Sequence, residues 1–141
     1  MKSLKHLLIY TDGGARGNPG PAACGVVIKN VDKTIVHQAF KTLGTTTNNE
    51  AEYQGVLMAI KIVLEQFPET SNITFHLDSL LVVKQLTGEF KIKNARLKEL
   101  FNEAQSLVRQ AKATVTYVHI PRELNYEADL LVNQALDNAG F

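Results

Sequence analysis

Short apolar runs separated by turn-forming residues open the chain. The runs at His6–Tyr10, Ala22–Lys29 and Thr34–Thr42 are typical of β-strands. Residues Asn30–Lys33 have the length and composition of a hairpin turn, so we expect an antiparallel three-strand meander. The intervening segment Gly13–Pro21 contains so many Gly and Pro residues that we expect no regular structure there.

Beyond the meander the pattern changes to a helical one. Residues Asn48–Phe67 are predicted to form a helix that is capped by Asn48 or Asn49 and ended by Pro68. The run Asn72–Leu77 is β-branched and aromatic and predicts a fourth strand.

The last third of the chain continues the alternation. Residues Ser79–Leu86 predict a short helix closed by Gly88. An amphipathic helix follows, because apolar residues recur with helical spacing at Leu97, Leu100, Phe101, Ala104, Leu107, Val108 and Ala111. A strand at Ala113–Ile120 and a helix at Asn125–Asn138 complete the order β-β-β-α-β-α-α-β-α. This order predicts an α/β fold with one mixed sheet and helices on its faces, in a single domain over residues 1–141.

The bulk composition excludes some classes and leaves others open. A chain of 141 residues with 45% hydrophobic and 21% charged residues is typical of one soluble globular domain. Its apolar runs are far shorter than a membrane helix needs, so we expect no membrane association. A single cysteine favours the reducing cytoplasm. The net charge of +1 does not indicate a nucleic-acid binder, so any such affinity must come from a local patch or a bound metal.

Two of the predicted strands end in an aspartate. Thr11-Asp12 follows the first strand, and Asp78 follows the fourth. Ligands of open α/β sheets bind at the carboxyl ends of strands, so Asp12 and Asp78 meet there if these two strands are parallel neighbours. Each residue taken alone is better explained as a turn starter or a helix cap.

Glu52 strengthens the functional interpretation. On a helical wheel, three apolar residues lie within about 40° of Glu52: Val56, Ala59 and Val63. Its carboxylate therefore faces the sheet, where a buried charge is costly unless it is compensated. No Arg or Lys lies on this face, so a metal ion shared with other carboxylates is the simplest explanation. Glu50 points to the opposite side and is expected in solvent.

Asp129 lies in the first turns of the last predicted helix. Alone it could simply stabilise the helix dipole. As a fourth ligand it would complete a cluster of hard oxygen atoms suited to Mg²⁺ or Mn²⁺. Two such ions about 4 Å apart can activate a water and stabilise the leaving oxygen of a phosphodiester.

Four segments of the chain, in this order, resemble the motifs of type 1 ribonuclease H: residues 10–22, 46–52, 77–79 and 121–129. They span nearly the whole chain. The last one, Pro-Arg-Glu-Leu-Asn-Tyr-Glu-Ala-Asp, resembles the archaeal and plant-like branch of the family, which lacks the basic, aromatic-rich handle of the bacterial enzymes. Consistently, residues 88–94 leave no room for that handle.

The resemblance implies a ribonuclease H-like fold with a five-stranded mixed sheet in the order 3-2-1-4-5 and helices on both faces. It implies hydrolysis of the RNA strand of RNA–DNA hybrids, with 5′-phosphate and 3′-hydroxyl products. It also implies that Asp12, Glu52, Asp78 and Asp129 are catalytic and ligate Mg²⁺ or Mn²⁺, with two ions present when substrate is bound. We expect the protein to act as a monomer.

Family enzymes read the minor groove of the hybrid, where 2′-hydroxyls distinguish RNA from DNA. The glycine-rich segment can approach the substrate closely, which makes Gly13, Gly14 and Arg16 candidate contacts. Four further residues match family positions that contact the DNA phosphate or the sugars: Asn18, Thr47, Asn48 and Asn49. One of the two asparagines could instead be chiefly the helix cap.

Lys91 and Lys93 stand where the handle is missing. Together with nearby Arg96 and Lys98 they form either a reduced phosphate-binding patch or a merely solvated face. His119 aligns with a histidine of the bacterial branch that assists water activation or product release, and a proton-shuttling role competes with that of an ordinary strand-end histidine.

Two other functions fit part of this pattern. A DNA-directed nuclease of the same fold would share the carboxylates but not the Gly-Asn-Pro-Gly-Pro or Thr-Asn-Asn segments. A non-catalytic hybrid-binding module would not need four acids facing phosphates.

Overall fold

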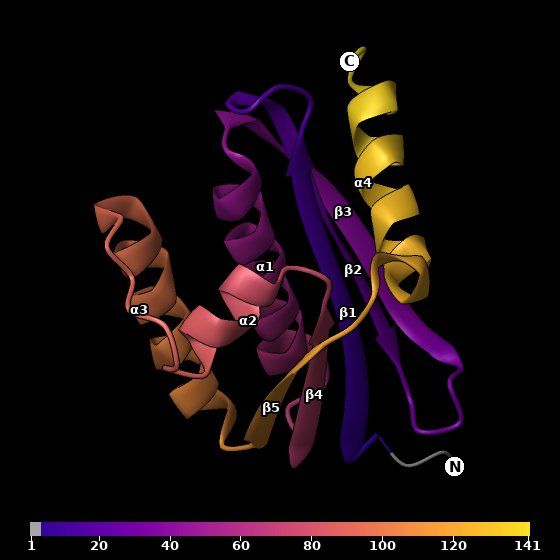
Figure 1. The fold of residues 1–141 in the computed structure, drawn as a ribbon. Helices are drawn as coiled ribbons and strands as arrows, with labels where there is room; N and C mark the ends of the chain where they lie inside the picture. Colours follow the sequence, from indigo (N-terminus) through magenta and orange to yellow (C-terminus); the bar gives the residue numbers. More distant parts are fainter. Residues whose placement is uncertain (1–3) are drawn as a thin grey trace.

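A single five-stranded sheet carries the fold of residues 4–141, the part of the chain that the computed structural model describes (Figure 1). The strands lie in the order β3-β2-β1-β4-β5. They are β1 (His6–Ala15), β2 (Gly20–Lys29), β3 (Ile35–Thr46), β4 (Asn72–Leu77) and β5 (Thr114–His119). The first three pair antiparallel, whereas β1–β4 and β4–β5 are parallel. The strand order that the family resemblance implied is therefore confirmed.

Helices cover both faces of the sheet. They are α1 (Asn48–Gln66), α2 (Leu80–Leu86), α3 (Ala95–Ala111) and α4 (Tyr126–Asn138), with a 3₁₀ turn, η1, at Arg122–Asn125. α1 and α3 pack together on one face, and α4 lies alone on the other (Figure 1). None of the helices within residues 4–141 is both long and apolar enough to cross a membrane.

The strand β2 is buried on both faces, which explains its nearly continuous apolar sequence. Its residues Val26 and Ile28 join the large core beneath α1 and α3. Ala23 and Val27 instead pack against the apolar side of α4. Because successive strand residues point to opposite faces, β2 links two separate cores and fixes α4 over the centre of the sheet.

The prediction that Gly13–Pro21 has no regular structure is wrong for most of that segment. β1 continues to Ala15 and β2 begins at Gly20, with register pairs up to Ala15↔Ala22. The glycines serve close packing here: a Cβ on Gly13 would lie 2.2 Å from the carbonyl carbon of Ala51 in α1. Only residues 16–19 form the turn, with Gly17 in the left-handed region at φ 104°.

The predicted cap of the first long helix is also wrong. Thr47 caps α1, and its hydroxyl accepts a hydrogen bond from the backbone N–H of Glu50 at 3.2 Å. Asn48 is unavailable for capping because its side-chain oxygen accepts from the N–H of Ala15 at 2.8 Å. Strand β3 extends four residues beyond its predicted end, and η1 has no counterpart among the predicted elements. The predicted boundaries of α1, β4, α2, β5 and α4 agree with the structure to within one residue.

Candidate active site

Three carboxylates from different elements meet at the carboxyl end of the parallel strands. Asp12 lies in β1, Glu52 in the second turn of α1, and Asp78 directly after β4. Each offers an oxygen such that the three atoms lie within 4.8 Å of one another. The parallel pairing of β1 with β4 places Asp12 beside Asp78, as the strand-end argument predicted. The N–H of Gly13 donates to Glu52 at 3.0 Å and fixes the carboxylate of that residue.

Burial dominates the electrostatics of this cluster. Asp12 is 6% exposed and Glu52 is 5% exposed. Loss of solvent raises the pKa of Asp12 to about 7; a hydrogen bond with Glu52 opposes that rise, and the negative charges of Asp78 and Asp129 add to it. Loss of solvent likewise raises the pKa of Glu52 well above its usual value. Without a cation, these two neighbours therefore tend to hold protons at neutral pH.

The donor set fits a hard divalent cation. All three side chains offer carboxylate oxygens, which are the ligands that Mg²⁺ and Mn²⁺ prefer. When Asp12 and Glu52 are both ionised, the buried Oε2 of Glu52 has no hydrogen-bond donor among residues 4–141. An unpartnered anionic oxygen at 5% exposure is costly, and a bound cation would compensate it.

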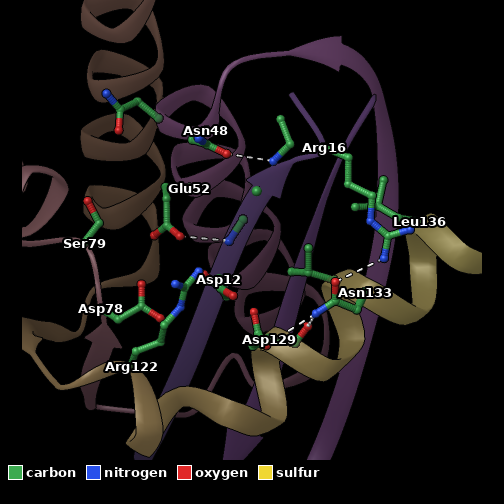
Figure 2. A pocket seen from close by; sticks show the side chains of 15 residues that line it. Asp12, Arg16, Asn48, Glu52, Asp78, Ser79, Arg122, Asp129, Asn133 and Leu136 are labelled. Carbon is green, nitrogen blue, oxygen red and sulfur yellow. Dashed lines mark hydrogen bonds between the residues drawn. The ribbon is translucent and has the colours of Figure 1, made fainter. Parts of the chain in front are cut away.

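Asp129 lines the same pocket from the first turns of α4 but lies outside the group of three. The pocket has a volume of about 310 Å³ and is open to solvent. Figure 2 shows Asp129 on the side of the pocket opposite Ser79, with the side-chain amide of Asn133 donating to its Oδ2 at 3.4 Å. The structure thus brings together Asp12, Glu52 and Asp78, and it places Asp129 at the same cavity.

Two residues, one that lines the pocket and one that contacts Asp78 behind it, were not singled out from the sequence. Arg122, in η1, lines the pocket, and Figure 2 shows its side chain running toward the carboxylates. Arg122 is exposed, and among residues 4–141 its guanidinium has no hydrogen-bond or ion-pair partner. Asn125, also in η1, donates to Asp78 and is buried. Both lie in the last motif segment, but no periodicity distinguishes them because they belong to a single turn.

The turn at residues 16–19 closes one side of the pocket. Arg16 lines it, and its guanidinium donates to Asn133 at 3.2 Å (Figure 2). The same guanidinium pairs with Asp137 at 2.8 Å and donates to the carbonyl of Phe141. Gly13 and Gly14 also line the pocket. Asn18 accepts from the N–H of Asn48 at 3.0 Å and so ties this turn to the start of α1.

A second, smaller cavity of about 250 Å³ lies beside the start of α1. Asn18, Thr47 and Asn49 line it together with Asn94 and Arg96 from the start of α3. Asn49 lines the carboxylate pocket as well, so the two cavities share a wall. Glu50, expected in solvent, instead forms an ion pair with Arg96 at 3.2 Å. That pairing keeps the pKa of Glu50 below its usual value despite partial burial.

Lys91 and Lys93 lie outside both cavities, in the connection between α2 and α3. Both are exposed. Lys91 borders a shallow groove of about 370 Å³ that also holds Phe90, Lys98 and Phe101. His119 is the last residue of β5, pairs in register with Leu77, is exposed, and is not among the residues that line the carboxylate pocket.

Comparisons with known proteins agree with this fold. A family described as reverse transcriptase-like matches residues 10–135. A bifunctional protein of Mycobacterium tuberculosis is 37% identical over 134 residues, which are 94% of this chain and 36% of that protein. A protein named ribonuclease HI from Halobacterium salinarum is 38% identical over 130 residues, or 92% of this chain and 64% of its own length. The chain thus spans between about one third and two thirds of these relatives.

A solved structure covers the fold more completely. The crystal structure of LC11-RNase H1 in complex with an RNA/DNA hybrid has a TM-score of 0.91 and 40% sequence identity. The match covers 94% of this chain and 98% of that one. At this level of identity and coverage, the likeness extends beyond the fold to the sequence.

Proposed function

The chain belongs to the type 1 ribonuclease H family, and on that premise we propose that it hydrolyses the RNA strand of RNA–DNA hybrids, leaving 5′-phosphate and 3′-hydroxyl ends. One observation carries the proposal: three carboxylates, of which Asp12 and Glu52 are buried, converge within 4.8 Å at an open pocket. A similar protein, LC11-RNase H1, forms a complex with an RNA/DNA hybrid.

We assign Asp12, Glu52, Asp78 and Asp129 as the ligands of Mg²⁺ or Mn²⁺, with two ions when substrate is bound. Such ions supply an activated water and neutralise charge on the leaving oxygen. The raised pKa values of Asp12 and Glu52 support this assignment, because a nearby cation would favour the ionised form of both groups at neutral pH. The position of Asp129 on α4, facing the other three, supports its role as the fourth ligand.

The substrate is held by the residues around the two cavities. Backbone groups of Gly13 and Gly14 can approach the minor groove at the carboxylates. Asn18, Thr47 and Asn49 line the second cavity, where their polar side chains suit phosphate and sugar oxygens. Asn48 and Arg16 support the same surface by holding the turn at residues 16–19 against α1 and α4.

Arg122 is the positive group best placed to contact the scissile phosphate, because it lines the carboxylate pocket with no internal partner among residues 4–141. Lys91 and Lys93 extend the contact along the duplex as exposed phosphate-binding charges. We assign His119 no step in this mechanism, because it is exposed at the end of β5 and outside the pocket lining. We place the protein in the cytoplasm as a monomer, which its single, buried cysteine supports.

A cleavage assay tests the function directly. End-labelled RNA–DNA hybrid, duplex RNA and duplex DNA are each incubated with and without Mg²⁺ or Mn²⁺. We expect metal-dependent cleavage of the RNA strand of the hybrid. Cleavage of duplex DNA in preference to the hybrid would instead favour a DNA-directed nuclease of the same fold.

The variant Asp12→Asn tests the mechanism. Removal of a metal ligand should lower the cleavage rate by more than the roughly 10–100-fold that loss of an outer-sphere partner usually causes. Hybrid binding, measured by fluorescence anisotropy, should remain. Asp32→Asn makes the same change in the exposed turn between β2 and β3 and serves as the matched control. Unchanged turnover in Asp12→Asn would contradict the mechanism.

A further inference from the structure

Asn125 links three of the elements that carry the carboxylates. It is the last residue of η1 and directly precedes α4, so Asp129 follows it by about one helical turn. Its side-chain Nδ2 donates to the backbone carbonyl of Thr11 at 2.8 Å and to Oδ2 of Asp78 at 3.1 Å. One amide group therefore joins β1, the end of β4 and the start of α4.

The orientation of this amide is determined by its surroundings. Both contacts are to acceptors, a carbonyl and a carboxylate, so only the NH₂ end of the amide can face them. Asn125 is 1% exposed, and its Oδ1 has no hydrogen-bond partner among residues 4–141. A buried unpaired oxygen destabilises the fold. Stability alone therefore poorly explains why an asparagine occupies position 125. Its two donated hydrogen bonds explain that choice better.

The bond to Asp78 leaves one carboxylate oxygen of that residue free. Oδ2 is held by Asn125, and the other oxygen remains available to a cation. In metal sites, such outer-sphere hydrogen bonds fix the orientation of a ligating carboxylate. The simultaneous bond to Thr11 ties Asp78 to the backbone of β1 immediately before Asp12.

We propose that Asn125 is a positioning residue that holds Asp78 in register with Asp12 for metal binding, and that sets the start of α4 so that Asp129 faces them. This inference rests on the proposed function, since it assumes that the carboxylates bind a divalent cation. Asn125 itself touches neither the cation nor the substrate. Its effect appears in metal affinity rather than in substrate affinity.

The test compares Asn125→Ala with the wild-type protein and with Ile73→Ala. Ile73 is a buried residue at the far end of β4, so its truncation lowers stability without touching the pocket. Binding of Mn²⁺ to the substrate-free protein is followed by water-proton relaxation, well below the melting temperature. We expect Asn125→Ala to weaken Mn²⁺ binding by roughly 10–100-fold, and Ile73→Ala to leave it within about twofold of the wild type.

Activity gives a second readout. In Asn125→Ala the metal concentration for half-maximal cleavage should rise with the dissociation constant of Mn²⁺, while KM for the hybrid stays near the wild-type value. If the alanine variant does not fold, Asn125→Ser repeats the test, because a hydroxyl is too short to reach both acceptors. A folded variant with unchanged Mn²⁺ affinity would overturn the inference about Asn125 and leave the proposed function intact. Failure of the wild-type protein to bind Mn²⁺ through Asp12 would overturn both the inference and the proposed function.

Discussion

At the scale of single residues, the site depends on contacts that bring the backbones of β1 and α1 unusually close together. The N–H of Gly13 donates to Glu52, and the position of a Gly13 Cβ would be occupied by the carbonyl of Ala51. The missing side chain is therefore what allows Asp12 and Glu52 to approach each other. The adjacent Gly14 has no such restriction, since its nearest neighbour is Oδ1 of Asn48 at 3.9 Å.

Alanine substitutions should show that Gly13 is required for close packing and that Gly14 is not. Gly13→Ala places a methyl group against backbone atoms that cannot move aside, so we expect a loss of about 3 kcal/mol or more in the free energy of unfolding. Gly14→Ala should change it by less than about 0.5 kcal/mol. Urea denaturation followed by circular dichroism measures both. Equal stability of the two variants would show that α1 can move away from β1 without cost.

Individual residues also show where sequence reasoning succeeds. Glu52 could be identified because an acid on the apolar stripe of a helix is unusual, and the structure indeed buries it at 5% exposure. Arg122 could not be identified in the same way, because a charged residue in a short turn is common. The sequence did not identify Thr47 as the cap of α1 and indicated only a substrate contact for it. Several polar residues stand in a row there, and each of them could begin the helix.

At the scale of elements, the alternation of strands and helices was predictable from hydrophobic periodicity. The predicted and observed bounds of β4 coincide because Asn72–Leu77 is flanked by polar and turn-forming residues. The extension of β1 through Gly13–Ala15 was not predictable, because local composition favours a turn there while pairing with β2 overrides it. The turn η1 depends on tertiary interactions such as the bond from Asn125 to Thr11, which no local pattern encodes.

The connection between α2 and α3 carries a prediction of its own. Lys91 and Lys93 are both exposed there, so each can release counterions by binding a phosphate of the hybrid. We expect the double variant Lys91→Ala, Lys93→Ala to reduce the slope of log affinity against log salt by about 0.7–0.9 for each phosphate that it no longer binds. Anisotropy titrations with an uncleaved hybrid and the Asp12→Asn protein, at several salt concentrations, measure the slope.

Lys61→Ala is the matched control for this experiment. It removes one positive charge, as each of the two substitutions does, from the C-terminal half of α1, where Lys61 pairs with Glu103 and lines neither cavity. We expect its salt slope to equal that of the parent protein. A slope that is unchanged in the double lysine variant as well would mean that the lysines form only a solvated surface.

At the scale of the whole molecule, the fold gathers four carboxylates around one pocket, and none of them forms an ion pair within residues 4–141. The sheet order brings Asp12 and Asp78 together, and α1 and α4 add Glu52 and Asp129 from opposite faces (Figure 2). The pKa of Asp12 rises to about 7 in the folded chain because burial removes solvent. The folded state consequently binds this proton more tightly than the unfolded state, in which an aspartate has a pKa of about 3.9.

This linkage predicts how stability changes with pH. The contribution of protonated Asp12 to the free energy of unfolding is fully present below about pH 4, and it is lost as the pH rises to about 7. In the absence of divalent metal, Asp12→Asn should therefore be more stable than the wild type at pH 7.5, by a few kcal/mol at most, and the difference should shrink toward pH 5. Urea denaturation in the presence of a chelator measures it. A wild type that is the more stable of the two at pH 7.5 would contradict the raised pKa.

Addition of Mn²⁺ should reverse the order of stabilities. A ligand that binds only the folded state at a hundred times its dissociation constant stabilises by about 2.7 kcal/mol. Because the ligating carboxylates must lose their protons, the stabilisation should be larger at pH 7.5 than at pH 5. Asp12→Asn should gain little at either pH, since it lacks the ligand that joins β1 to the cluster. Equal gains in the two proteins would mean that the ion binds elsewhere, and that the buried carboxylates are not its site.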